Sequence, residues 1–333
     1  VLPLLAAALL VFFSVLAGLF SARAGFSFLL VFLLAGILAG EDGPGGIVFD
    51  DVNLSFWVGN VALAVILLDG GLRTDFATFR TGLKPALLLA SVGVVMSAAL
   101  TAFGAWWLMG LDWRLAMLLG SIVGSTDAAA VFALLRSSGV RLNERVAATL
   151  EIESGMNDPM AVYLTIAFIG IALAGTRGTA ADGGALGPWG EAIKALVQQF
   201  GLGGVIGGVA GVALAALLKR SFPRFAAQQQ GAASGGGILA LLCVSLGLAV
   251  FAGTSWVGGS GFLAVYVMGV TARARAREAV APALSALDGY AWLSQAAMFL
   301  LLGLLLTPHQ LLPGLAPALG VAAFLLLVAR PLT

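Results

Sequence analysis

Apolar runs long enough to cross a lipid bilayer recur along almost the entire chain. A helix needs about 20 mostly apolar residues to span the hydrocarbon core, and about eleven such runs can be counted in the 333 residues. Because backbone polar groups inside a bilayer must be satisfied by the segment itself, we predict an all-α polytopic membrane protein. The predicted spans are 2–20, 26–40, 54–72, 85–109, 114–135, 144–174, 191–218, 236–252, 256–272, 290–306 and 311–331.

Lys and Arg are distributed unevenly between the two sets of loops. When each loop is numbered by the span it follows, thirteen of the 17 basic residues lie in odd-numbered loops, against three in the even-numbered loops and the head of span 191–218. Positive residues favour the cytoplasmic side, so we predict cytoplasmic odd loops and an N-terminus outside. The arginines of "TARARARE" are interpreted as ordinary anchors rather than an effector site. Basic residues scattered in this way give no argument for nucleic acid as a partner.

The order of the spans predicts two related halves. The first repeat covers about 1–175, a linker helix covers about 191–218, and an incomplete second repeat covers about 236–333. An odd linker helix makes the second repeat start from the opposite side of the membrane, which is the geometry of an inverted-repeat transporter. Two spans of the second repeat are missing, so we expect either a fragment of a longer chain or an incomplete site.

The stretch "ESGMNDP" places several polar side chains inside an apolar span. A buried charge costs about 2.5–3.5 kcal/mol at the bilayer centre, so the cluster is expected to have a function. On a helix the polar side chains share one arc of about 160°. Glu151 alone is equally explained as a solvated entry residue. The other members of the arc are Glu153, Ser154, Asn157 and Asp158.

Two backbone features accompany this polar helix. Pro159 has no N–H for the Gly155 carbonyl, which predicts either a plain kink or an additional oxygen ligand. The preceding span carries "GSIVGSTDAAAVF" at 120–132, where small residues and hydroxyls precede Asp127. Small residues alone indicate close packing, but an aspartate among them favours an interrupted helix facing a cavity.

Carboxylate, hydroxyl and carbonyl oxygens without Cys or His nearby suit a hard monovalent cation or a proton. A carboxylate that binds either a proton or a cation, but not both at once, is the minimum requirement for an exchanger. A channel would need a pore-lining filter, and none is visible. An intramembrane hydrolase would need a nucleophile paired with a base, and no nucleotide-binding P-loop occurs. We therefore predict a secondary transporter rather than an enzyme, with no cofactor besides the transported ions.

Several stretches carry a family resemblance: "GSTDAAAVFALL", "RLNERVAATLEIESGMNDPMAVYLT", "LLDGGLRTDFATFR", "GFLAVYVMGV", "LDGYAWLSQAAMFLLLGLL" and "VARPL". They resemble the monovalent cation:proton antiporters, and most closely the potassium/proton antiporter group within them. The resemblance runs from about residue 5 to the last residue and implies about thirteen spans in a cell inner membrane. It also implies a homodimer in which a core bundle moves against a dimerisation domain.

The resemblance implies an ion site and its charge partners. Its Asn-Asp pair is typical of the electroneutral branch, which moves one proton per monovalent cation. Arg330 matches an arginine that neutralises buried acids, with Glu153 and Asp69 as expected partners. Potassium is favoured by the resemblance, and Na+/H+ exchange by the same fold stays open as the alternative. The implied ion-binding residues are Thr126, through its backbone carbonyl, Asp127, Glu153, Ser154, Asn157 and Asp158.

Three weaker signals have ordinary interpretations. Gly203, Gly207 and Gly211 recur every four residues, which predicts close packing of the 191–218 helix against another helix. His309 is interpreted as an incidental residue of an outside turn rather than a pH sensor, and Asp42 as part of a solvated loop.

Overall fold

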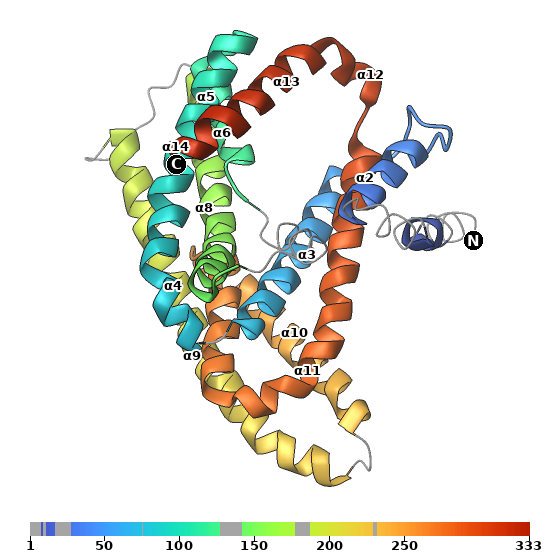
Figure 1. The fold of residues 1–333 in the computed structure, drawn as a ribbon, viewed down its shortest axis with the longest axis vertical. Coiled ribbons are helices and arrows are strands. Elements are labelled where there is room, and N and C mark those ends of the chain that lie inside the picture. The colour runs from blue at the N-terminus through green and yellow to red at the C-terminus, as the bar shows by residue number, and fades with distance from the viewer. Residues whose placement is uncertain are drawn as a thin grey trace. The chain divides into compact units, whose positions relative to one another are not determined.

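The computed structural model describes residues 8, 11–16, 28–74, 76–126, 142–176, 187–228 and 232–333 (Figure 1). Regular structure in these ranges is helical, apart from one isolated bridge between Gly40 and Ile47. Seven helical stretches within them are long and apolar enough to cross a membrane. The predicted fold class, an all-α polytopic membrane protein, is confirmed. The helices are α2 (Phe28–Ala39), α3 (Val52–Arg73), α4 (Phe76–Leu88), α5 (Val94–Met109), α6 (Trp113–Val123), α8 (Glu144–Thr176), α9 (Gly187–Gln228), α10 (Ala232–Trp256), α11 (Gly261–Leu305), α12 (Pro308–Leu311), α13 (Leu315–Phe324) and α14 (Arg330–Leu332).

Most predicted spans coincide with these helices. Predicted spans 26–40 and 54–72 correspond to α2 and α3, while 85–109 continues from α4 through a π-helical turn, η2 (Leu89–Gly93), into α5. The predicted separation of spans 236–252 and 256–272 is confirmed, because α10 ends at Trp256 and α11 begins at Gly261. Gly258 there has φ of +81°, a conformation that favours glycine.

The segment between predicted spans 256–272 and 290–306 is helical on both sides of a break at Ala276, so α11 consists of two helices joined across a kink rather than of two spans joined by an extended loop. Alanine recurs across this stretch, and alanine has the highest helix propensity, which outweighs the charges that suggested a loop. The helix changes direction at Ala276, whose backbone is non-helical at φ −138° and ψ 44°. The arginines of "TARARARE" therefore lie on a kinked helix.

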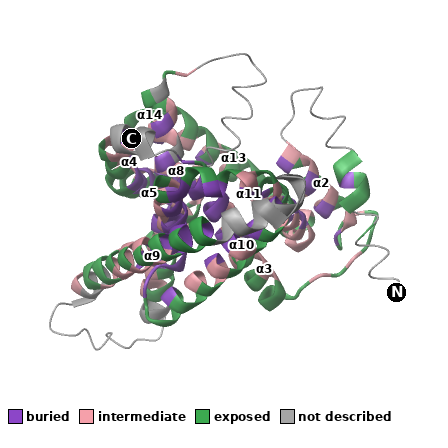
Figure 2. Ribbon diagram, turned by 90° about the horizontal axis from the view of Figure 1, so that it is seen from below, coloured by how far each residue is buried: buried purple, intermediate pink, exposed green. Residues whose placement is uncertain are grey.

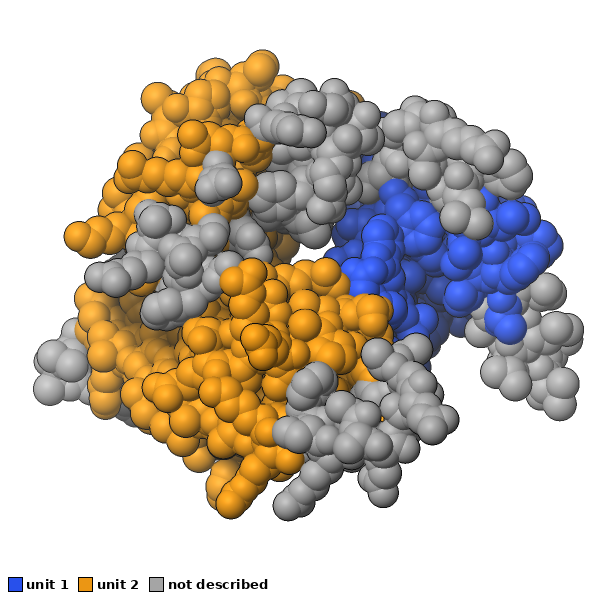
Figure 3. Space-filling model, turned by 60° about the horizontal axis from the view of Figure 1, so that its bottom comes forward, with its two compact units in different colours: residues 1–66, 128–141, 287–315 blue, residues 67–127, 142–286, 316–333 orange. Residues whose placement is uncertain are grey.

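The chain forms two compact units, coloured separately in Figure 3. Unit 1 comprises residues 1–66, 128–141 and 287–315, and unit 2 comprises residues 67–127, 142–286 and 316–333. Both units combine segments that are far apart in the sequence. The two units are not the two predicted inverted repeats, because each unit combines segments from both halves of the chain. The inverted repeats stay a prediction.

Unit 1 is held by packing between α2 and the second half of α11. Phe32, Ala296 and Leu300 form a buried cluster. Gly36 and Gly303 face each other so closely that a Cβ on either glycine would meet the backbone of the other helix. Between membrane helices, close van der Waals packing at small residues stabilises such a contact.

A histidine–aspartate contact joins two connecting segments of unit 1. The backbone N–H of His309 donates to Asp42 Oδ2 at 2.9 Å, and the His309 ring Nδ1 lies 2.6 Å from Asp42 Oδ1. The backbone hydrogen bond, followed by the ring, holds the pKa of Asp42 below its ordinary value of 3.8. His309 thus has a specific partner that its interpretation as an incidental turn residue did not include.

In unit 2, the three regularly spaced glycines of α9 pack against α11 and the residue before it. The prediction of close packing is confirmed, because each of the three glycines abuts a carbonyl oxygen of α11 or of Ser260, the residue just before it; Figure 2 colours the buried positions of these helices purple. A Cβ would meet that oxygen at Ser260 for Gly203 (2.8 Å), at Ala264 for Gly207, and at Met268 for Gly211 (2.7 Å).

Replacing Gly207 with alanine is expected to lower the thermal unfolding midpoint of the purified protein by several degrees. The added methyl group would meet the carbonyl of Ala264, and overpacking of this kind costs about 1–3 kcal/mol. Gly208→Ala is the matched control, because its Cβ would have nothing within 4 Å and it restricts the unfolded chain equally. Equal midpoints for the two variants would contradict the packing argument.

Candidate functional site

The candidate site begins where α6 ends. Asp112 caps the start of this helix by accepting a hydrogen bond from the Arg114 backbone N–H. The helix ends at Val123, and Gly124, Ser125 and Thr126 leave the helical path. Small residues and hydroxyls hold a helix poorly, so the predicted interruption begins where the sequence placed it. Asp127, the predicted second carboxylate of the site, lies outside the described residues.

The polar stretch of α8 runs past this helix end. It stays helical through Pro159, which removes the donor for the Gly155 carbonyl. Asn157 is fully buried, while Glu153, Ser154 and Asp158 are half-buried. The side chain of Glu151 is outside the described set. These positions place the predicted polar arc against the residues that follow α6.

Ser125 contacts the carboxylate expected to exchange ions. Its hydroxyl donates to Asp158 Oδ1 at 2.5 Å and lies 3.1 Å from Asn157 Oδ1. A hydroxyl has one hydrogen, so the shorter contact to the carboxylate is its main hydrogen bond. Sequence reasoning did not include Ser125 in the site. The available signal was its hydroxyl within the small-residue run, two positions before Asp127.

Asn157 links the two chain segments through its amide group. Its Nδ2 donates to Thr126 Oγ1 at 2.6 Å and to Glu153 Oε1 at 2.9 Å. The Thr126 hydroxyl also donates to Glu153 Oε1, at 2.9 Å. A buried amide with both hydrogens engaged is a rigid and uncharged clamp. Asn157 therefore positions Glu153 and Thr126 around the site.

The backbone carbonyl of Thr126, a predicted ligand, faces α8. It accepts a hydrogen bond from Ser154 Oγ at 3.1 Å and a longer one from Asn157 Nδ2 at 3.4 Å. A carbonyl oxygen has two lone pairs and a serine hydroxyl can rotate. The same oxygens can therefore turn from internal hydrogen bonding to coordinating a cation.

Arg330 neutralises the broken end of α6. Its Nη2 donates to the carbonyls of Gly124 and Ser125, both at 3.1 Å. The last carbonyls of a helix carry partial negative charge and lack intrahelical donors, so a cation there is stabilising. Arg330 is also attracted electrostatically to Glu153, one of its two expected partners.

The expected pairing of Arg330 with Asp69 requires correction. Asp69 instead pairs with Arg73, one turn along the same helix, with Arg73 Nε 2.8 Å from Asp69 Oδ2. Arg73 also donates to the Leu284 carbonyl. A local i, i+4 partner needs no movement of another helix, which explains why Asp69 is neutralised without Arg330.

The donor set of the site is oxygen only. Carboxylate, hydroxyl, amide and carbonyl oxygens come together within unit 2, and the described residues hold no group of three or more His, Cys, Asp or Glu side chains suited to a metal ion. Oxygen ligands with few charges suit a hard monovalent cation. The predicted Glu153, Ser154, Asn157, Asp158 and Thr126 are thus brought together, with Ser125 added.

Comparison with known proteins gives the family. Residues 9–333 match the family described as sodium/hydrogen exchanger, transmembrane. The K+/H+ antiporter NhaP of Alkalimonas amylolytica is 45% identical over 331 residues, covering 99% of this chain and 54% of that protein. The K+/H+ antiporter NhaP2 of Shewanella oneidensis is 47% identical over 328 residues, covering 98% of this chain and 53% of that protein. The chain spans about half the length of these curated relatives.

A solved structure gives the fold. The sodium proton antiporter MjNhaP1 of Methanocaldococcus jannaschii, determined at pH 8, superposes with a TM-score of 0.76 at 22% identity. The match covers 98% of this chain and 75% of that one. The antiporter fold expected from the resemblance is confirmed. With a family match over residues 9–333, the chain belongs to the sodium/hydrogen exchanger family.

Proposed function

We propose that the protein containing this chain exchanges a monovalent cation, with K+ favoured, for H+ across the membrane. The observation that carries the proposal is the 45% and 47% identity, over nearly the entire chain, to proteins named K+/H+ antiporters. The oxygen-only network around Asp158 supplies a chemistry suited to this exchange. The homodimer, the outside N-terminus and the inverted repeats belong to the same proposal.

Exchange follows from competition at Asp158. When its carboxylate is deprotonated, a dehydrated cation binds it together with oxygens of Ser125, Ser154 and Thr126, and with Asp127 as the further ligand. The two serine hydroxyls turn their hydrogens away, so that their lone pairs face the ion. Protonation of Asp158 removes the negative charge whose attraction offsets the free-energy cost of cation dehydration. The cation then leaves. Only the occupied or the protonated carrier changes sides.

Electroneutral exchange fits the charge inventory of the site. Asn157 stands beside Asp158 as an uncharged clamp, and Glu153 is engaged by Thr126 and Asn157 and attracted by Arg330. One exchanging carboxylate then carries either one proton or one cation. Glu153 acts as a fixed structural charge in this arrangement.

Sodium is the second candidate ion. The family description names sodium, and MjNhaP1 is a sodium proton antiporter. The same oxygen ligands bind either ion, and selectivity depends on the dimensions of the cavity rather than on the residue types.

The decisive experiment measures proton flux in proteoliposomes made with the full-length protein. A K+ pulse is expected to move protons out of acid-loaded vesicles faster than an equal Na+ pulse, and the rate is expected to be independent of membrane potential. Below the pH at which Asp158 titrates, the apparent K+ affinity is expected to weaken about tenfold per pH unit, because protons compete for one site. Protein-free vesicles are the control. Absence of cation-dependent flux would refute antiport, and potential-dependent flux would refute electroneutrality.

A further inference from the structure

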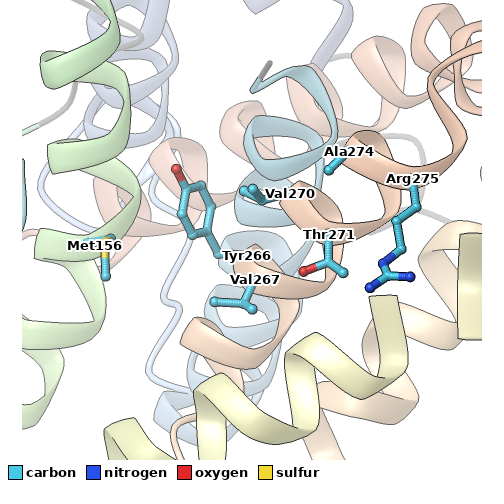
Figure 4. A pocket seen from close by; sticks show the side chains of 7 residues that line it. All are labelled: Met156, Tyr266, Val267, Val270, Thr271, Ala274 and Arg275. Carbon is cyan, nitrogen blue, oxygen red and sulfur yellow. The ribbon is translucent and has the colours of Figure 1, made fainter. Parts of the chain in front are cut away.

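A cavity lies beside the polar network, on another face of α8. It has a volume of about 430 Å³ and is lined by Met156 of α8 and by residues of α11 (Figure 4). Tyr266 and Met156 stand at one side of the view, with Thr271 and Arg275 at the other. Met156 lies between Gly155 and Asn157 in the sequence. The cavity therefore borders the turn of α8 that carries the candidate site.

The ring of Tyr266 separates this cavity from Gly155. Tyr266 is 2% exposed and lines the cavity. A Cβ on Gly155 would lie 2.5 Å from Cε2 and 2.7 Å from Cζ of the ring. The ring thus occupies space that only a glycine at position 155 leaves open. Gly155 is also the residue whose carbonyl has lost its helical donor to Pro159.

The backbone of Tyr266 is held from its other side. A Cβ on Gly71 of α3 would lie 2.5 Å from the carbonyl oxygen of Tyr266, and Gly269 packs against the backbone of Gly71 and Leu72. Close backbone contact leaves α11 little room to move away from α8 toward α3 at this level. The tyrosine ring is therefore held in place against the turn of α8 that lacks the hydrogen bond to the Gly155 carbonyl.

We propose that Tyr266 is a positioning residue for the ion site, and this inference rests on the proposed antiport. Its ring sets the path of α8 from Gly155 to Asp158 and keeps water in the cavity away from the freed Gly155 carbonyl. The ring acts through its shape, which phenylalanine at this position keeps. Loss of the Tyr266 ring changes the placement of Asp158 relative to Ser125. The cation affinity and the preference between K+ and Na+ change with it.

The test uses size changes on both sides of the contact. Apparent K+ affinity and the K+/Na+ preference are measured in proteoliposomes of the full-length protein. Gly155→Ala and Tyr266→Leu are each expected to weaken K+ affinity about tenfold, as packed neighbours couple strongly. Leucine lacks the Cε2 and Cζ atoms that would meet a Cβ at 155, so the Gly155→Ala/Tyr266→Leu double variant is expected to recover most of the affinity. Tyr266→Phe is expected to match the parent.

Two further measurements separate positioning from general damage. Gly170→Ala on the same helix is the matched control, because its Cβ would have nothing within 4 Å, and it is expected to transport like the parent. Maximal rates per folded protein are expected to stay within about twofold of the parent, so that the change lies in affinity. Additive losses in the double variant, or a Tyr266→Phe variant as weak as Tyr266→Leu, would overturn the positioning role. A parent without cation-dependent flux would instead refute the antiport, and this inference with it.

Discussion

Replacing Asp158 with asparagine is expected to reduce cation-dependent proton flux by about 100-fold or more. Asparagine has nearly the same shape and keeps an oxygen to accept the Ser125 hydrogen bond, so the fold is expected to survive. It has neither the charge that attracts a cation nor a proton to exchange. The flux assay in proteoliposomes measures the effect, with the thermal midpoint recorded in parallel.

The matched control for this variant is Asp112→Asn. Asp112 is an exposed cap at the start of α6, where its side chain accepts from the Arg114 backbone N–H at 2.9 Å. Asparagine caps a helix about as well as aspartate, so flux and midpoint are expected to be unchanged. If Asp158→Asn exchanged ions at the rate of the parent, Asp158 could not be the exchanging carboxylate.

Replacing Arg330 with methionine is expected to abolish transport and to lower the unfolding midpoint clearly. The variant loses two charged hydrogen bonds to the Gly124 and Ser125 carbonyls, and such bonds contribute about 1.5–3 kcal/mol each. It also removes the positive charge that offsets Glu153 and the carbonyl end of α6. Thermal unfolding and proton flux of the same preparation measure the two effects.

Two variants define how Arg330 acts. Arg330→Lys keeps the charge but loses the planar guanidinium group, whose Nη2 donates to both carbonyls. An intermediate midpoint is therefore expected. Arg220→Met makes the same change at an exposed position of α9 and is expected to leave both quantities unchanged. A midpoint for Arg330→Met equal to that of Arg220→Met would show that the carbonyl contacts contribute nothing to stability.

Local sequence patterns predicted much of the fold and part of the candidate site. Hydropathy located the helices, the glycine spacing of α9 predicted close helix packing, and the small-residue run at 120–132 marked the stretch in which α6 ends. The polar arc of α8 followed from helical periodicity alone. The helical structure on both sides of the break at Ala276 was missed for a local reason, because charge was given more weight than alanine content.

The partners of each side chain depended on the tertiary structure. Ser125 and Asp158 are 33 positions apart, and Arg330 and Gly124 are 206 positions apart, so no sequence periodicity relates them. Asp69 resembled a partner for Arg330 by motif, but its own helix supplies Arg73. The same holds for Tyr266, whose contact with Gly155 appears only when α8 and α11 are packed.

The sequence by itself determined which segments are apolar helices and which of their residues carry oxygen ligands. Those properties follow from composition and from the period of a helix, which act over a few residues. Only the tertiary structure decided which oxygens meet, which charge Arg330 offsets and which ring lies against Gly155. Contacts between distant segments arise from the packing of whole helices, and many sequences with the same local patterns can satisfy them in different ways.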